Sequence, residues 1–345
     1  MTHSDEPTGG GHGVTVILTV RNDAQGAAVT VESLLKQTRK PDEIVVVDGG
    51  STDATRSVLE DYARRDDVIR IIDAPGANIA AGRNLATSAA NHPIIAGIDG
   101  GCRANPDWLE QLLRPFEDDP STEFVAGLYR IEPQSLLEHV VGLATMRGQI
   151  EPVDPKRFNA SGRSIAYTKN LWRRAGGWPD WIRYAEDTLF NHRIRAVTGH
   201  RRLAERAIVH WRPRGSIAAI AKQFFCYGTG RGHTQIDAAS FRYNLRNVAL
   251  VVVAACACAW TWYLAPLLIA LLAYFYVWTF HGKAVRLVEH TGRWQAYPLT
   301  LCVMWTVLFS NLAGYLVGSW QRFRNPGTYK ERMNAFLGRT CSHAI

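Results

Sequence analysis

The first hundred residues repeat one pattern, in which a short apolar run rich in β-branched residues is followed by a segment with helical spacing. Strands are predicted over residues 14–20, 43–47, 68–73 and 94–99, and helices over residues 29–37, 54–64 and 80–90. Uninterrupted apolar runs of this length are typical of strands buried on both faces, and their alternation with helices indicates a parallel sheet. We therefore predict an α/β fold with a mostly parallel central sheet.

Three of the predicted strands lead into loops that carry an aspartate: Asp23, Asp48 and Asp99. Because the carboxyl ends of parallel strands lie at one edge of a sheet, where ligands bind in open α/β folds, these side chains are predicted to share a site. Asp99 is a candidate ligand for Mg²⁺ or Mn²⁺, which prefer hard oxygen donors, or else a cap of the following turn. Asp48 is suited to accept hydrogen bonds from the N–H edge of a base, whereas Asp53 has the spacing of a helix cap.

Several basic residues have two open interpretations each. Arg83, in the segment NIAAGRN, either binds a phosphate in bidentate fashion or lies on the surface of a helix. His210 follows an apolar, strand-like stretch, and it either completes a metal site with Asp99 or is a structural histidine. Arg212 and Arg214 come shortly after it and are candidates for holding a phosphate of a donor or of a lipid acceptor.

Glu186 and Asp187 follow the aromatic turn WPDWIRY and open a predicted helix. A general base must be placed against the nucleophilic hydroxyl and be partly desolvated, and this crowded setting suits that role. We assign Asp187 as the candidate base and place Glu186 at the positive end of the helix, beside the acceptor. Farther along, the segment 224–232 is rich in glycine and aromatic residues and contains Arg231, so it approaches a ligand closely, serves as a flexible connector, or does both.

Two long stretches without charged residues, 247–280 and 294–321, predict a membrane region. A bilayer span takes about 20 apolar residues, so the second stretch matches one span. The first is too long for one upright span and too short for two with a loop, and Pro266 divides it, so it is a broken, tilted helix or a tight hairpin. Basic residues flank both stretches on every side, so the positive-inside rule leaves the count at two or three segments.

The charge distribution favours a membrane surface over nucleic acid as the partner. The net charge is +8, from 39 Lys+Arg against 31 Asp+Glu, and basic residues gather beside the last apolar stretch, at Arg322, Arg324, Lys330, Arg332 and Arg339. This placement favours the anionic cytoplasmic leaflet. The six cysteines have neither metal-binding nor disulfide spacing. Residues 1–13 are polar and glycine-rich, which predicts a disordered leader without a signal peptide and a cytoplasmic soluble part.

Five stretches resemble, in this order, the family-2 glycosyltransferases of GT-A fold: VTVILTVRNDA (14–24), IVVVDGGSTDAT (44–55), IDGGCRANPDWL (98–109), GGWPDWIRYAEDTLFNHRIRAVTG (176–199) and VHWRPRGSIAAIAKQFFCYGTGRG (209–232). The ending Tyr-Gly-x-Gly-Arg-Gly, followed by membrane segments, is most similar to the succinoglycan-type exopolysaccharide glucosyltransferases, which elongate sugars on a polyprenyl carrier for the cell envelope.

This resemblance implies an inverting transfer of a hexose from a nucleotide sugar, UDP-linked, to a lipid-linked or membrane-proximal saccharide. It implies that Asp23 and Asp48 contact the uracil and ribose, that Asp99 binds the metal on the diphosphate, and that Asp187 deprotonates the acceptor hydroxyl. The metal, Mg²⁺ or Mn²⁺, would stabilise charge on the leaving diphosphate. The complete predicted site has donor contacts at Asn22, Asp23, Asp48, Arg83, Asp99 and Gly100, metal ligands at Asp99 and His210, and acceptor or phosphate contacts at Glu186, Arg212, Arg214 and Arg231.

Two departures from the family pattern bear on these roles. The usual Asp-x-Asp motif is here Asp99-Gly100-Gly101, so the second carboxylate is missing and metal dependence is an open question. The segment Gln223–Tyr227 lacks the Gln-x-x-Arg-Trp of processive synthases, which favours the addition of one sugar per encounter. The alternatives are a polyprenyl-phosphate sugar synthase and an inactive nucleotide-sugar sensor. A dinucleotide-dependent oxidoreductase is disfavoured because the first strand does not lead into G-x-G-x-x-G.

We predict five parts in the chain. They are the leader (1–13), a GT-A domain (14–215), an amphipathic, interfacial connector (216–246), a membrane region with two or three transmembrane or re-entrant helices (247–320), and a basic cytoplasmic tail (321–345). The expected location is the inner membrane, with the catalytic domain on the cytoplasmic side and the lipid bilayer as a partner.

Overall fold

A computed structural model describes residues 13–146, 149, 153 and 158–338 of the chain. Nearly all of the predicted leader and the last residues of the predicted tail therefore lie outside the described residues. The chain divides into two compact units. The first comprises Met1–Arg130, Pro155–Asp180 and Glu186–Trp211, and the second comprises Ile131–Asp154, Trp181–Ala185 and Arg212–Ile345.

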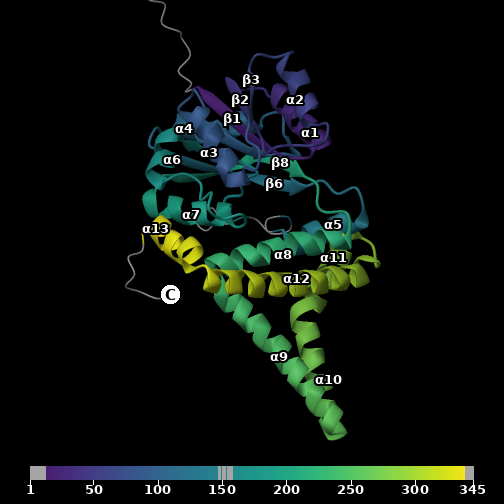
Figure 1. Cartoon of the computed structure of the whole chain (residues 1–345). Coiled ribbons are helices and arrows are strands. Elements are labelled where there is room, and N and C mark those ends of the chain that lie inside the picture. The colour runs from purple at the N-terminus through teal and green to yellow at the C-terminus, as the bar shows by residue number, and fades with distance from the viewer. Residues whose placement is uncertain (1–12, 147–148, 150–152, 154–157, 339–345) are drawn as a thin grey trace, which may run out of the picture. The chain divides into compact units, whose positions relative to one another are not determined.

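The first unit is built on a mixed sheet, several strands of which are labelled in Figure 1. Its eight strands have the order β3-β2-β1-β4-β7-β6-β8-β5. β1, β2, β3 and β4 pair in parallel, whereas β7 pairs antiparallel with β4 and β6, and β5 pairs antiparallel with β8. The strands are β1 (Val14–Val20), β2 (Glu43–Asp48), β3 (Ile69–Asp73), β4 (Ile94–Asp99), β5 (Cys102–Ala104), β6 (Phe124–Ile131), β7 (Ile165–Thr168) and β8 (Arg201–Trp211).

The apolar runs of the sequence form the parallel half of this sheet, in which β1 and β2 are covered on both faces. Every residue of β2 is buried, and so is every residue of β1 except Thr19. The helices of this unit are α1 (Ala24–Leu35), α2 (Thr55–Ala63), α3 (Ile79–Ala89), α4 (Trp108–Asp118), α6 (Lys169–Ala175) and α7 (Glu186–Val197). The predicted α/β fold is confirmed, and the parallel part of its mixed sheet is formed by β1, β2, β3 and β4, while the short strand β5 and the full length of β8 were not foreseen.

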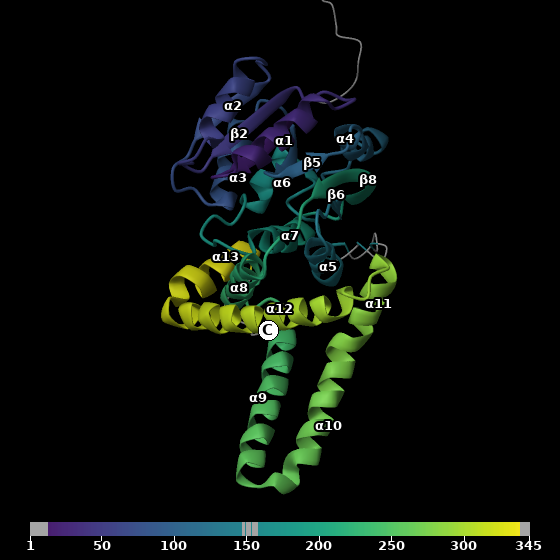
Figure 2. The same cartoon turned by 90° about the vertical axis from the view of Figure 1, so that its right-hand side faces the viewer.

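The second unit is helical within the described residues. Its helices are α5 (Leu136–Thr145), α8 (Ile217–Thr234), α9 (Ala238–Trp260), α10 (Ala265–Tyr276), α11 (Gly282–Thr291), α12 (Ala296–Arg324) and α13 (Arg332–Leu337). A short turn of 3₁₀-helix, Trp262–Leu264, joins α9 to α10, so the first apolar stretch forms a hairpin. Figure 2 shows that α9 and α10 extend away from α12, which runs across the open end of the hairpin.

Three segments of the described residues are long and apolar enough to cross a membrane, by length and composition. They are Ala238–Trp260, Ala265–Thr291 and Ala296–Arg324. Pro266 lies in the first turn of α10, where its missing N–H removes no helical hydrogen bond. Of the two interpretations of residues 247–280, the structure therefore has the hairpin.

The glycines of residues 224–232 pack one helix against another. α8 continues through this segment, and a Cβ atom on Gly228 would lie 2.2 Å from the carbonyl oxygen of Asn311 in α12. In the other direction, a Cβ on Gly314 would lie 2.1 Å from the carbonyl oxygen of Phe225. Gly232 and Gly318 make equally close approaches. The interpretation of residues 224–232 as a flexible connector is therefore wrong, because the glycines let two helix backbones touch.

Candidate functional site

The carboxyl ends of three neighbouring strands gather the predicted acidic residues of the first unit. β1 lies between β2 and β4, and the parallel registers pair Val20 with Asp48 and Thr19 with Asp99. Asp23 follows two residues after Arg21 in the turn that leaves β1. The three aspartates therefore share the edge of the sheet at which open α/β folds bind ligands.

Hydrogen bonds tie the turn after β1 to the turn after β2. Asn22 adopts a left-handed conformation with φ of 52°, and its side-chain oxygen accepts a 2.8 Å bond from the backbone N–H of Thr52. The backbone N–H of Asn22 donates to Ser51 Oγ at 2.9 Å. Ser51 in turn donates from its own N–H and hydroxyl to Asp48 Oδ1, at 2.9 and 2.7 Å. Asn22 and Asp48 thus belong to one ordered pair of turns.

The loop after β4 lies against the start of α1. Asp23 caps α1, because its Oδ1 accepts a 3.0 Å bond from the N–H of Gly26. A Cβ atom on Gly101 would lie 3.4 Å from Asp23 Oδ2. Gly101 has φ of +82°, a left-handed conformation that favours glycine. The position of the missing second carboxylate is therefore next to Asp23, in backbone geometry that disfavours an aspartate.

Arg83 of α3 joins the carboxyl end of β4 to the start of α7. Its side chain is buried, and Nη2 donates to Asp99 Oδ1 at 2.6 Å while Nη1 contacts Glu186 Oε1 at 3.3 Å. The guanidinium group also lies 4.5 Å from the centre of the Trp178 ring. A Cβ on Gly162 would lie 2.3 Å from Nη2, so Gly162 leaves the room that the guanidinium occupies. Arg83 is therefore an internal ion-pair partner, with its donors directed at two carboxylates.

The electrostatics of this cluster are dominated by burial. Burial, together with the neighbouring charge of Asp187, raises the pKa of Glu186 to about 7, and the opposing attraction of Arg83 only limits the rise. Burial alone would lower the pKa of Arg83, but Asp99 and Glu186 outweigh it, so the net shift is upward. The single positive charge of Arg83 thus faces three carboxyl groups, those of Asp99, Glu186 and Asp187. A proton on Glu186 reduces the excess negative charge.

The first turn of α7 holds both acidic residues of the sequence motif. Asp187 Oδ1 accepts a 2.7 Å bond from the N–H of Thr188. Behind this turn, the rings of Trp178 and Phe190 stack with centroids 3.9 Å apart, and Phe190 meets Tyr167 edge to face. These buried aromatic contacts fix the start of α7, and with it the position of Asp187.

Glu186→Gln is expected to remove most of the fall in stability of the chain between about pH 4.5 and 7. The pKa of Glu186 is raised to about 7, above its ordinary value of 4.5, so in this window the folded state binds more protons than the unfolded state. Stability therefore falls as pH rises, by about 3 kcal/mol across the window. Thermal unfolding of the full chain in detergent at several pH values measures this. Glu117→Gln, on an exposed side chain, is the control, and a Glu186→Gln variant with the full wild-type pH dependence would contradict the assignment.

Of the predicted metal ligands, Asp99 is the carboxylate that could bind a divalent ion. His210 Nε2 lies 2.8 Å from Asn105 Oδ1, and His210 pairs with Arg103 across β5 and β8. Among the described residues no group of three or more His, Cys, Asp or Glu side chains is placed to hold a metal ion. Asp99 keeps about one third of its side chain exposed while Arg83 holds its Oδ1. This donor set fits an ion of the Mg²⁺ type, which takes one or two carboxylates and completes its shell with substrate phosphates and water.

The predicted basic contacts after β8 belong to the second unit. Arg212 donates from Nε and Nη2 to Oε1 of the buried Glu138, at 3.0 and 2.8 Å. Arg231 pairs with Asp237 at 2.8 Å, and Arg214 is exposed. The structure brings Arg83, Asp99, Glu186 and Asp187 together in the first unit, and the roles of the three arginines of the second unit stay predictions.

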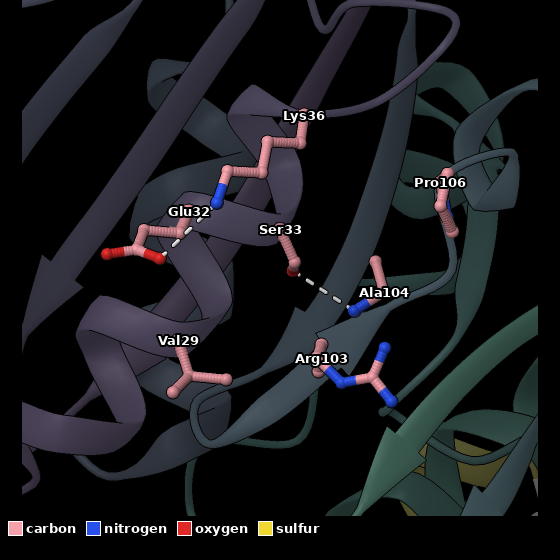
Figure 3. Close-up of a pocket in the computed structure, with 7 residues that line it drawn as sticks. All are labelled: Val29, Glu32, Ser33, Lys36, Arg103, Ala104 and Pro106. Carbon is pink, nitrogen blue, oxygen red and sulfur yellow. Dashed lines mark hydrogen bonds and ion pairs between the residues drawn. The ribbon is translucent and has the colours of Figure 1, made fainter.

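A hollow of about 260 Å³ lies between α1 and β5 (Figure 3). Its lining residues are Val29, Glu32, Ser33, Lys36, Arg103, Ala104 and Pro106. Ser33 Oγ accepts a 3.0 Å bond from the N–H of Ala104, and Lys36 and Glu32 form an exposed ion pair at the rim. None of the predicted site residues lines it.

Sequence reasoning missed Trp178 and Gly162. Both shape the environment of Arg83, and both lie far from it along the chain. The sequence predicts only that the aromatic turn WPDWIRY, which contains Trp178, provides a crowded entry to the next helix. The contact between the Arg83 guanidinium and the Trp178 ring joins segments about 95 residues apart in the sequence. No local sequence pattern can therefore predict it.

Comparison with known proteins identifies relatives of the first part of the chain. Residues 15–171 match the family described as Glycosyl transferase family 2. "Uncharacterized glycosyltransferase EpsJ" of Bacillus subtilis is 27% identical over 187 residues, which cover 52% of this chain and 54% of that protein. "Glucosyl-dolichyl phosphate glucuronosyltransferase" of Haloferax volcanii is 28% identical over 156 residues, which cover 43% of this chain and 50% of that protein. The chain thus spans about half the length of these relatives.

A solved structure shares the fold over most of the chain. The mannosyltransferase PcManGT from Pyrobaculum calidifontis, in complex with GDP-Man and Mn²⁺, superposes with a TM-score of 0.54 at 17% identity. The match covers 90% of this chain and 88% of that structure. At this identity the likeness establishes the fold.

Proposed function

Because this chain contains a glycosyl transferase family 2 domain with the GT-A fold, we propose that it transfers a hexose from a UDP-linked sugar to a hydroxyl group of a lipid-linked or membrane-proximal saccharide. The observation that carries the proposal is the cluster at the carboxyl edge of the sheet, where Arg83 holds Asp99 beside Glu186 and Asp187. The cluster places a strand-end carboxylate next to a candidate base. A group-transfer site needs these two elements side by side.

The donor occupies the turns after β1, β2 and β4 in this proposal. Asp48 and Asp23 contact the uracil and ribose, and Gly100 lets the backbone approach the donor. Support comes from the bonds that order these turns, with Ser51 linking Asn22 to Asp48. Arg83 acts by holding Asp99 in place rather than by binding phosphate, because both of its terminal nitrogens already contact carboxylates.

Asp187 takes the proton from the acceptor hydroxyl. As the acceptor oxygen forms a bond to the anomeric carbon, the bond from that carbon to the UDP oxygen breaks, so an α-linked donor gives a β-linked product. Glu186 is the less suitable base, since it is buried against Arg83 and its raised pKa keeps it partly protonated at neutral pH. Asp99 would hold Mg²⁺ or Mn²⁺, which supplies stabilisation of the charge on the leaving diphosphate when bound.

The acceptor is presented at a membrane surface. Three helices are long and apolar enough to cross a bilayer, and basic residues surround them, which suits the cytoplasmic face of the inner membrane. One relative is named for transfer to a glucosyl-dolichyl phosphate, a lipid-linked sugar, which supports this class of acceptor. The segment Gln223–Tyr227 of α8 lacks the Arg-Trp of processive synthases, which supports the addition of one sugar per encounter.

The test is UDP release by the purified full chain in detergent, with a panel of UDP- and GDP-sugars and with membrane lipid extract as acceptor. We expect release of UDP that depends on the extract and labelled sugar in a lipid-linked saccharide. Label on bare polyprenyl phosphate would indicate a polyprenyl-phosphate sugar synthase instead. Binding of UDP without turnover of any donor would indicate a sensor, and a parallel series with EDTA and added Mn²⁺ measures metal dependence.

A further inference from the structure

The longest helix of the second unit, α12, is bound along its length to a helix that carries charges. α8 and α12 run parallel, because Phe225 meets Gly314, Thr229 meets Gly318 and Gly232 meets Ser319 at backbone distances. We call this close contact the glycine seam: Gly228 and Gly232 of α8 against Gly314 and Gly318 of α12.

Polar bonds continue the contact beyond the glycine seam. Gln235 bonds to both Ser319 and Tyr315, at 3.0 and 2.9 Å. His233 Nε2 lies 2.6 Å from Gln321 Oε1, and Arg322 donates to the carbonyl oxygen of His233 at 2.8 Å. α12 and α8 are therefore one rigid pair, and both must have the same orientation to a membrane.

α8 is unsuited to the interior of a bilayer. It carries Lys222 and Arg231 on exposed positions, about 13 Å apart along the helix at ~1.5 Å per residue. If α12 crossed the membrane, its partner would take both charges into the hydrocarbon, at a cost of about 2.5–3.5 kcal/mol each near the centre. A position of the pair parallel to the membrane surface avoids this cost.

The opposite side of α12 is apolar. From residue 302 to residue 323 every exposed side chain of α12 is apolar: Cys302, Phe309, Ala313, Leu316, Val317, Trp320 and Phe323. At about 100° per residue, Leu316 lies on the far side of the helix from Gly314 and Gly318. We call this set the apolar face of α12.

The direction in which the hairpin extends indicates on which side of α12 the membrane lies. In both views α9 and α10 extend away from α12 on the side opposite to α8 (Figures 1 and 2). The charged residues of these helices lie near the open end of the hairpin, at Arg242 and Arg246 in α9 and at Lys283, Arg286 and Glu289 in α11 (Gly282–Thr291), and basic residues outnumber the acidic one. The tip of the hairpin carries the exposed aromatic residues Trp260, Trp262 and Tyr263. A basic rim at one level and aromatic residues at the other match the two interfaces of a bilayer. About 21 Å separates Arg246 from Trp260 at ~1.5 Å per residue, which with snorkelling approaches the core thickness of about 30 Å.

We propose that α12 lies in the plane of the near membrane interface with its apolar face in the lipid, and that only the α9–α10 hairpin enters the bilayer. Two passes, rather than three, then leave α13 on the same side of the membrane as α8. The ring of Tyr329 stacks on that of His233, with centroids 4.0 Å apart. This contact is consistent with two passes, because it places the segment that follows α12 against the polar end of α8. This inference rests on the membrane association proposed above.

The test measures the depth of α12 in vesicles of phosphatidylethanolamine and phosphatidylglycerol. Single-cysteine variants Phe309→Cys, Leu316→Cys and Phe323→Cys, in a cysteine-free full chain that still binds UDP, carry a fluorophore quenched by spin-labelled lipids of known depth. We expect all three at one shallow depth within a few ångström. A graded difference approaching ~21 Å, the axial distance from residue 309 to residue 323, would overturn the proposal. Leu250→Cys, Val253→Cys and Cys256 in α9 form the matched series, in which depth should increase stepwise.

A second measurement needs no substitution. In sealed vesicles that expose the catalytic domain, trypsin should cleave at Lys330 and Arg332, which follow α12. Cleavage there only after the vesicles are opened would mean that α12 crosses the bilayer. A chain that a carbonate wash removes from the vesicles would instead refute the membrane association itself, so the two failures are distinguishable.

Discussion

Asp187→Asn is expected to lower the rate of sugar transfer by about 10²–10⁴-fold while changing UDP binding by less than about twofold. Asparagine keeps the size of the side chain and can still accept the bond from the N–H of Thr188, so the first turn of α7 should persist. What it removes is the carboxylate that we propose takes the acceptor proton. Initial rates of UDP release and calorimetric titration of UDP measure the two effects separately.

Asp180→Asn is the matched control, because Asp180 lies a few residues earlier with its side chain exposed. It should leave both quantities unchanged. Equal losses of transfer and UDP binding in Asp187→Asn would show that Asp187 is a donor contact or a structural residue. In that case Glu186→Gln becomes the informative variant, since it removes the other carboxylate of the same turn.

Arg83→Met is expected to lower the free energy of unfolding by about 3–5 kcal/mol and to abolish transfer. Methionine fills much of the space beside Trp178, but it leaves the buried Glu186 and the partly buried Asp99 without their shared counter-charge. Removal of one partner from a buried ion pair costs more than the pair contributes, because the remaining charge stays desolvated. Thermal or denaturant unfolding of the full chain in detergent gives the change.

Arg56→Met provides the comparison. Arg56 also pairs with two carboxylates, Glu60 and Asp73, but it does so at the surface, where an ion pair contributes less than about 1 kcal/mol. A destabilisation by Arg83→Met no larger than that by Arg56→Met would mean that the Arg83 pairs are solvated in solution. Lowering the pH should partly rescue Arg83→Met, because protonation of Glu186 removes one of the unpaired charges.

The half of the sheet that carries the site was predictable because its signals are local. A strand buried on both faces is an unbroken apolar run in the sequence, so β1, β2 and β4 were predicted, and with them the alignment of Asp23, Asp48 and Asp99. The edge strand β3, which has one buried residue, was predicted from the alternation of strands and helices. The strands β5 and β8 were not found or only partly found, because they are short or polar at many positions. Their pairing depends on contacts between residues about 107 positions apart, such as Arg103 with His210.

Local sequence patterns could not predict the ion pairs of Arg83 or the packing of α8, for two different reasons. The sequence shows an arginine at a helical position, and only the fold reveals that the carboxylates of Asp99 and Glu186 meet it. In α8, three glycines within five residues argue against a helix on propensity, since glycine costs about 1 kcal/mol relative to alanine. The close approach of α12 outweighs that cost, and the partner lies some 80 residues later.

The glycine seam also sets an order of events during synthesis of the chain. The strands of the sheet are complete once Trp211 has been made, so the first unit has all of its strands before α8 is finished. α8 then has weak intrinsic helicity and an exposed groove of backbone until residues 311–318 emerge. By that time the hairpin has been made, so α12 closes onto α8 only as the last large step. A ribosome pause or a truncation before residue 296 would leave α8 without α12, its packing partner. We expect proteases to remove such incomplete chains before the full-length chain.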